Sequence, residues 1–126
     1  VHGADGLDEL TIADKTYVAA CSSAGDVETF TVSPDDFGLE RQPFDGFRGK
    51  GPKENAELIR AILQGGETTS MGAARDLVII NAAAALYVAG VAQDLRSAAG
   101  LARESINSGR AASKLDALVL ETNRSS

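Results

Sequence analysis

The stretch Arg75-Asp76-Leu77-Val78-Ile79-Ile80-Asn81-Ala82-Ala83-Ala84-Ala85-Leu86 decides the fold of this chain. Together with the next two residues it is apolar nearly all round, so it predicts a helix over residues 75 to 88 that is buried rather than lying on the surface. Asp76, near the start, suits the positive end of the helix dipole. Asn81 sits among apolar residues and is predicted to be structural, with hydrogen bonds to neighbouring backbone, because a buried amide needs partners.

Three further helices are predicted from capping signals and periodicity. Pro52 starts a helix over residues 53 to 64, which Gly65 and Gly66 end. After the buried helix, we expect two more, over residues 94 to 107 and residues 110 to 120, with Gly109 between them.

The first third of the chain has the composition of strands and turns. Two short β-type runs, residues 17 to 21 and 27 to 32, flank Ser22-Ser23-Ala24-Gly25-Asp26, which predicts a hairpin. Cys21 alternates within the first run and is predicted to be a small core residue. The segment Ser33-Pro34-Asp35-Asp36-Phe37-Gly38 then predicts a single helical turn.

The order of strands followed by helices sets the fold class. With at most three strands of its own, the chain is predicted to be α/β and locally α+β, or the C-terminal portion of a larger α/β sheet domain. Its 126 residues are the length of one domain. A chain of this size buries roughly two-thirds of the surface that it exposes when unfolded.

Composition and charge exclude several classes of protein. Hydrophobic residues make up 44% and charged residues 24%, which is typical of soluble globular proteins. With a net charge of −6, the chain lacks the excess of basic residues that is typical of a nucleic-acid-binding protein. The longest apolar run, residues 77 to 90, is too short to cross a bilayer, so we expect no membrane partner. The lone Cys21 excludes an internal disulfide, and there is no signal-peptide pattern, so we expect a cytoplasmic protein.

The chemistry is concentrated at the start, in Val1-His2-Gly3-Ala4-Asp5-Gly6-Leu7-Asp8-Glu9. On a loop that follows a strand, the carboxylates of Asp8 and Glu9 can converge. Two such ligands suit Mg²⁺, whose remaining positions are filled by substrate phosphates and water. The alternative is a solvated acidic turn, since Asp and Gly are favoured in turns anyway. His2 has a side chain that could act as a general base or contact phosphate, or could simply end a strand and bond to backbone.

Two other features give weaker evidence for a functional site. Gly46-Phe47-Arg48-Gly49-Lys50-Gly51 leads into a helix start and could cradle phosphate. It lacks the Walker spacing, so a flexible loop that caps the helix is the simpler interpretation. The serines of the late helices, Ser105, Ser108 and Ser113, have no histidine partner in sight and give no support to nucleophilic catalysis.

Five segments, in the same order along nearly the whole chain, resemble anthranilate phosphoribosyltransferase, the tryptophan-biosynthesis enzyme. They are the V-H-G-x-D-G-L-D-E start at residues 1 to 9, the turn Pro34-Asp35-Asp36-Phe37-Gly38, the P-x-x-N-A helix start at residues 52 to 56, the R-D-x-x-x-x-N-A-A-A-A-L helix at residues 75 to 86, and Ser108-Gly109-Arg110-Ala111 with Leu115-Asp116-Ala117-Leu118.

The resemblance implies a function and a fold. Members of this family transfer the phosphoribosyl group of phosphoribosyl pyrophosphate (PRPP) to anthranilate, and Asp8 and Glu9 match their magnesium-binding acidic pair. The family fold is a helical domain plus an α/β domain of the nucleoside phosphorylase/phosphoribosyltransferase type. Residues 1–126 are then expected to be the C-terminal part of that α/β domain, with Mg²⁺ as cofactor. No catalytic residue is assigned to this chain.

The sequence departs from the family in what it lacks. The family's G-T-G-G-D loop, N-x-S segment and K-H-G-N segment hold the diphosphate and the anthranilate, and none is present. We expect them upstream of Val1, with the helical domain through which family members form homodimers. The 126-residue chain alone is therefore expected to be inactive. A related phosphoribosyltransferase or nucleoside phosphorylase with another acceptor remains an alternative, as does a non-catalytic structural or interaction fragment.

Overall fold

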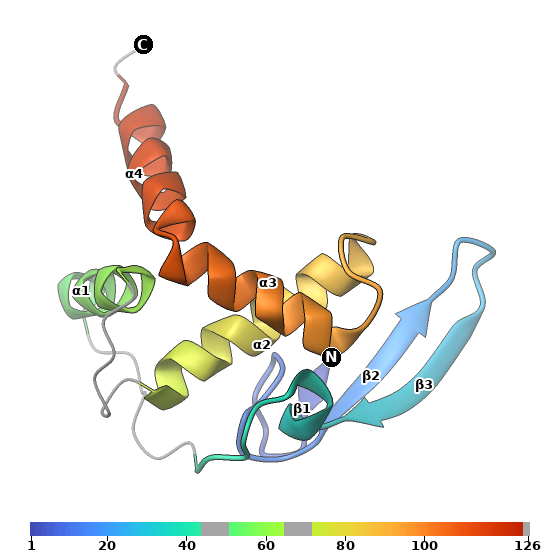
Figure 1. The fold of residues 1–126 in the computed structure, drawn as a ribbon. Helices are drawn as coiled ribbons and strands as arrows, with labels where there is room; N and C mark the ends of the chain where they lie inside the picture. Colours follow the sequence, from blue (N-terminus) through green and yellow to red (C-terminus); the bar gives the residue numbers. More distant parts are fainter. Residues whose placement is uncertain (44–50, 65–71, 125–126) are drawn as a thin grey trace.

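A computed structural model describes residues 1–43, 51–64 and 72–124. Along these described residues the chain forms three strands, one 3₁₀ helix and four α-helices, coloured in chain order in Figure 1. Their bounds are β1 His2–Gly3, β2 Thr16–Cys21, β3 Val27–Val32, η1 Pro34–Phe37, α1 Pro52–Leu63, α2 Gly72–Val88, α3 Leu95–Asn107 and α4 Arg110–Thr122. The predicted order of strands and then helices is confirmed.

The sheet is antiparallel throughout, with strand order β1-β2-β3. The β2–β3 hairpin pairs Cys21 with Val27 at its closed end. Its turn is closed by a hydrogen bond of 2.8 Å from the Ser22 N–H to the Asp26 carbonyl and has Gly25 at φ 89°. The predicted hairpin is confirmed, but the predicted burial of Cys21 is wrong, because this thiol is exposed. The hairpin tip extends beyond the helices in Figure 1, so none of the described helices covers it there.

The predicted helical turn after β3 forms as η1. The Asp36 carboxylate accepts hydrogen bonds from the Ser33 N–H at 2.7 Å and from the Ser33 hydroxyl at 3.0 Å. Gly38 ends the turn at φ 68°, a left-handed conformation that suits glycine. The turn delivers Phe37, only 2% exposed, into the core.

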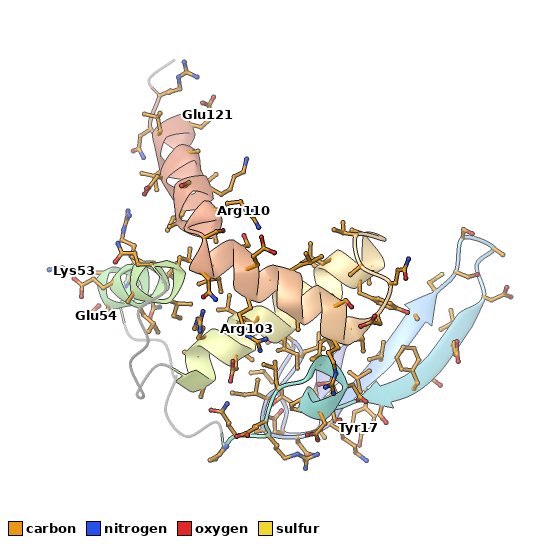
Figure 2. The ribbon with its side chains drawn as sticks, in the orientation of Figure 1. Tyr17, Lys53, Glu54, Arg103, Arg110 and Glu121 are labelled. Atoms are coloured by element: carbon orange, nitrogen blue, oxygen red, sulfur yellow. The ribbon has the colours of Figure 1, made fainter. Side chains whose placement is uncertain are left out.

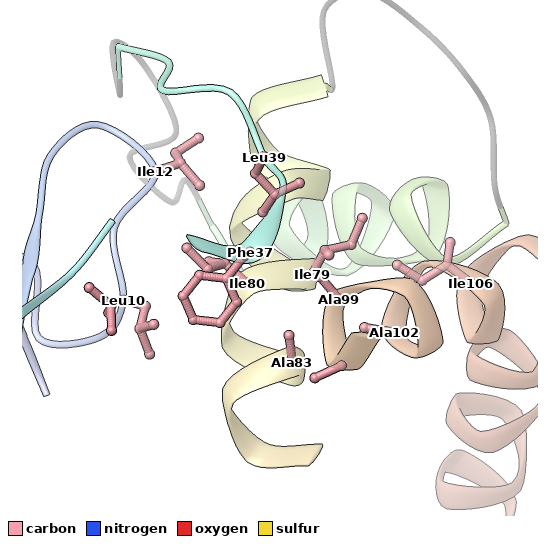
Figure 3. Packing of buried hydrophobic residues seen from close by; sticks show 12 residues of the cluster. Leu10, Ile12, Phe37, Leu39, Ile79, Ile80, Ala83, Ala99, Ala102 and Ile106 are labelled. Carbon is pink, nitrogen blue, oxygen red and sulfur yellow. The ribbon is translucent and has the colours of Figure 1, made fainter. Parts of the chain in front are cut away.

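The core lies where η1, the loop before β2, α2 and α3 meet (Figure 3). Small residues of α3, Ala99 and Ala102, face Ile79 and Ala83 of α2, which lets the two helices pack closely. The full buried cluster is Leu10, Ile12, Val32, Phe37, Leu39, Ile79, Ile80, Ala83, Ala98, Ala99, Ala102 and Ile106.

Helix α2 differs from its prediction in two respects. Only one of its faces is buried, and Val78, Tyr87 and Val88 on the other are exposed, because the described elements cover it from one side. The helix also begins at Gly72, so Asp76 lies in the second turn rather than at the positive end of the dipole. Its carboxylate instead accepts a hydrogen bond of 2.6 Å from the Gln42 side chain.

An exposed ion pair joins the two outer helices. Arg60 of α1 forms an ion pair of 3.5 Å with Asp116 of α4, and both side chains are largely exposed. Helix α4 contains no buried residue and carries side chains on every side, from Arg110 at its start to Glu121 near its end (Figure 2). Among the described residues, no helix combines the length and apolar character needed to cross a membrane.

Candidate metal centre

The acidic pair Asp8 and Glu9 lies on the connection between β1 and β2, and both residues are exposed. The connection folds back on itself at its start. The Gly3 N–H donates to the Leu7 carbonyl at 2.8 Å, and the Gly6 N–H donates to the Gly3 carbonyl at 3.0 Å. The segment before the pair is therefore a compact turn rather than an open loop.

The Asp5 side chain braces this turn through hydrogen bonds to two residues that follow it. One carboxylate oxygen accepts from the Leu7 N–H at 3.2 Å, and the other accepts from the Thr11 hydroxyl at 2.5 Å. Thr11 is fully buried, and its hydroxyl oxygen also accepts from the Ala13 N–H at 3.0 Å. The brace needs glycine at position 3, because a Cβ there would lie 2.5 Å from an Asp5 carboxylate oxygen.

The segment that directly follows the acidic pair is buried. Leu10, Thr11 and Ile12 are all buried, and the Thr11 N–H donates to the Thr16 hydroxyl at 3.2 Å. Asn81 of α2 reaches this segment from 71 residues away and bonds to both backbone groups of Leu10. The prediction that Asn81 would bond to neighbouring backbone is confirmed.

The two carboxylates of Asp8 and Glu9 suit a magnesium ion that takes its other ligands from substrate phosphates and water. Within residues 1–43, 51–64 and 72–124, neither Asp8 nor Glu9 forms an ion pair. The described residues contain no group of three or more His, Cys, Asp or Glu side chains placed to hold a metal. Magnesium commonly binds through one or two carboxylates plus phosphate oxygens and waters, so an incomplete protein set of this kind suits it.

The other predicted candidates gain no catalytic geometry. His2 lies in β1 opposite Tyr17 with its side chain exposed. The Ser108 and Ser113 hydroxyls donate to backbone carbonyls of Ser105 and Gly109, as helix-terminus serines commonly do. Residues 46 to 50 of the proposed phosphate loop lie outside the described residues, and Gly51 is the N-cap of α1.

A separate hollow of about 320 Å³ lies between the sheet and the end of α2. Its lining is mostly apolar, with Val18, Phe30 and Val88 among the contributors. Gln93 and Asp94 also line it, and the Asp94 carboxylate would repel a phosphorylated substrate.

The sequence prediction missed the roles of Asp5 and Thr11. A usable signal for Asp5 was present, because an Asp followed by Gly is typical of a turn in which the Asp side chain bonds the backbone two residues on. No sequence signal marks Thr11, whose role depends on its burial beside Asp5.

Comparison with known proteins defines the class. Residues 1–112 match the family described as glycosyl transferase family, a/b domain. The chain belongs to this family.

The relatives that it matches are anthranilate phosphoribosyltransferases. That of Methylocella silvestris is 46% identical over 126 residues, which cover 100% of this chain and 35% of the relative, and that of Thermomicrobium roseum is 44% identical over 125 residues, 98% of this chain and 35% of the relative. This chain therefore spans about a third of the length of the curated relatives that it matches. The resemblance seen in the sequence is confirmed.

Solved structures agree with this fold. The Saccharomyces cerevisiae enzyme in complex with PRPP and Mg superposes with a TM-score of 0.79 at 30% identity, over 91% of this chain and 32% of that chain. The Thermus thermophilus enzyme gives a TM-score of 0.75 at 33% identity, over 93% of this chain and 33% of that chain. The α/β fold class predicted from the sequence is confirmed.

Proposed function

We propose that residues 1–126 form the C-terminal part of the α/β domain of an anthranilate phosphoribosyltransferase, in which Asp8 and Glu9 bind the magnesium ion that accompanies PRPP. The observation that carries this proposal is the exposed carboxylate pair, held on a connection that Asp5 braces on one side and Asn81 on the other. The yeast neighbour is a complex with PRPP and Mg, which supports the use of magnesium with this substrate.

The chain's own residues have a limited task in this reaction. Asp8 and Glu9 bind the magnesium ion and orient it, while the hydrogen-bonded connection beneath them holds their backbone in place. When bound, Mg²⁺ supplies neutralisation of the charge that develops on the departing pyrophosphate. Displacement by the amine of anthranilate needs placement and electrostatic stabilisation rather than a covalent nucleophile on the enzyme.

The remaining expectations belong to the complete enzyme and form part of the proposal. We propose that it is a cytoplasmic homodimer and that the groups which bind the diphosphate and anthranilate lie outside this chain. The exposed free thiol of Cys21 supports a reducing compartment.

The test is a magnesium titration of the complete enzyme carrying Asp8→Asn or Glu9→Gln. Each change removes one anionic ligand but keeps the size of the side chain. We expect the magnesium concentration for half-maximal transfer to anthranilate to rise about tenfold or more, since lost ligand contacts of this kind weaken metal affinity. Glu28→Gln, an exposed carboxylate on β3, is the matched control and should leave the titration unchanged. If both site variants show the same magnesium dependence as the wild-type enzyme, Asp8 and Glu9 do not belong to the metal centre.

A further inference from the structure

We propose that Asn81 is a positioning residue for the acidic pair, because it fixes the peptide plane that leaves Glu9. This inference rests on the function proposed above for Asp8 and Glu9. It assigns a role in the site to a side chain of α2 that contacts no reacting group.

Asn81 makes three hydrogen bonds, and two of them go to one residue of the loop. Its side-chain oxygen accepts from the Leu10 N–H at 3.0 Å, and its side-chain nitrogen donates to the Leu10 carbonyl at 3.0 Å. The same nitrogen donates to the Leu77 carbonyl at 3.0 Å, one turn back along α2. The bond to Leu77 anchors the amide on its own helix, so the amide holds Leu10 as a neighbouring strand would.

The bond to the Leu10 N–H acts directly on Glu9. A peptide group is planar, and the plane that contains the Leu10 N–H also contains the Cα and carbonyl carbon of Glu9. Fixing this plane limits rotation about the backbone of Glu9 and so limits the direction of its side chain. Leu10 itself is 4% exposed and belongs to the core cluster, so it cannot move to compensate.

The other side of the pair is fixed in the same manner. The Gly3 N–H donates to the Leu7 carbonyl at 2.8 Å, and that carbonyl shares a peptide plane with the Cα of Asp8. The Asp8–Glu9 peptide is therefore held between two anchored planes. One anchor is local to the turn, whereas the other depends on Asn81.

The orientation of the two carboxylates matters because magnesium is strict about the positions of its ligands. The ion requires near-ideal octahedral geometry and tolerates little displacement of its ligands. Groups that orient the ligands of a metal, without touching it, change metal affinity by about 10- to 100-fold when they are removed. A purely structural role for Asn81 would instead lower stability and leave the magnesium dependence unchanged.

The experiment compares Asn81→Ala with Asp76→Ala in the complete enzyme. Asp76 is the matched control, because it also lies on α2 and hydrogen-bonds a side chain of a preceding loop, that of Gln42 at 2.6 Å. Three quantities are measured: the magnesium concentration for half-maximal rate, amide hydrogen exchange of the segment that contains Leu10, and the urea midpoint.

We expect Asn81→Ala to raise the half-maximal magnesium concentration about tenfold and to speed exchange at the Leu10 amide. Asp76→Ala should lower the urea midpoint while leaving both other quantities at their wild-type values. A magnesium shift no larger than that of Asp76→Ala, or an unchanged Leu10 exchange rate, overturns the positioning role.

Asn81→Asp keeps the test decisive if the alanine variant fails to fold. It preserves the size of the side chain but puts a carboxylate oxygen in place of the donor to the Leu10 and Leu77 carbonyls, and repulsion from both carbonyls displaces the side chain from the Leu10 N–H. We expect a raised magnesium requirement here too, and an unchanged one overturns the proposal. The titrations of Asp8→Asn and Glu9→Gln separate the two hypotheses: if both variants behave as wild type, the metal assignment fails, whereas a shift for either of them without one for Asn81→Ala refutes only the role of Asn81.

Discussion

Replacing Gly3 by alanine should break the brace beneath the acidic pair. A Cβ at this position would lie 2.5 Å from an Asp5 carboxylate oxygen and 3.2 Å from both the Leu7 Cβ and the Thr11 Cγ2. A Cβ atom does not come this close to another heavy atom in real structures, so the Asp5 side chain must rotate away. It then loses its hydrogen bonds to the Leu7 N–H and the Thr11 hydroxyl.

The expected cost follows from those two bonds. Hydrogen bonds to charged groups contribute about 1.5–3 kcal/mol each when buried, and less where water can replace them. The Thr11 bond lies at a fully buried residue, whereas Asp5 itself is exposed, so we discount the sum. Gly3→Ala should lower the free energy of unfolding by about 2–3 kcal/mol.

A double-mutant cycle in urea unfolding checks both the size and the cause. Asp5→Ala removes the obstructing carboxylate but leaves the two contacts at 3.2 Å, so adding Gly3→Ala in that background should cost at least about 1 kcal/mol less than in the wild type. Gly100→Ala is the matched control, because a Cβ there meets nothing within 4 Å. As a glycine inside α3, its replacement should stabilise by about 0.5–1 kcal/mol. An equal cost for Gly3→Ala in both backgrounds would refute the brace.

Two further predictions concern α2 and α3. Ile79 is fully buried between these helices, so Ile79→Ala should lower the free energy of unfolding by about 2–5 kcal/mol, whereas Val78→Ala, on the exposed face one residue away, should cost less than about 1 kcal/mol; comparable costs in urea unfolding would contradict the burial described for α2. The Ser97 N–H donates a hydrogen bond to the Asp94 carboxylate at 2.7 Å and holds the pKa of Asp94 below its ordinary value of 3.8. Because the folded-state pKa is the lower one, the stabilisation is present above pH 3.8 and is lost as the pH falls through the folded-state value. Asp94→Ala should therefore lower the urea midpoint at neutral pH, with a gap to wild type that narrows in acid; a gap that does not change with pH would exclude the charged cap.

The local structure was predictable because its causes are local. Turn residues between two β-type runs indicated the β2–β3 hairpin, and the Ser33 to Gly38 pattern indicated η1. Capping and periodicity located all four α-helices, although α2 begins three residues earlier than its apolar pattern does. The acidic pair could be identified as a candidate site from the segment that contains it, and its match to a known family, but neither source gives the orientation of its side chains.

Burial was predicted less well, because burial depends on which elements lie opposite. Cys21 alternates like a core residue, yet it lies at the uncovered end of the hairpin. The apolar character of α2 does not reveal which of its faces the rest of the described chain covers. Val88 at its end is 85% exposed, although Ile79 in its middle is fully buried.

The sequence by itself therefore determined the fold class and most of the elements, and it predicted the acidic pair as a candidate site, since each of these patterns lies in neighbouring residues. Only the tertiary structure decided how that pair is held. Asn81 meets Leu10 across 71 residues of sequence, and no local pattern encodes that contact. The packing of α2 against the start of the chain brings an amide with two hydrogen-bonding groups to a backbone with two unpaired ones, and that match fixes the loop on which the proposed magnesium site depends.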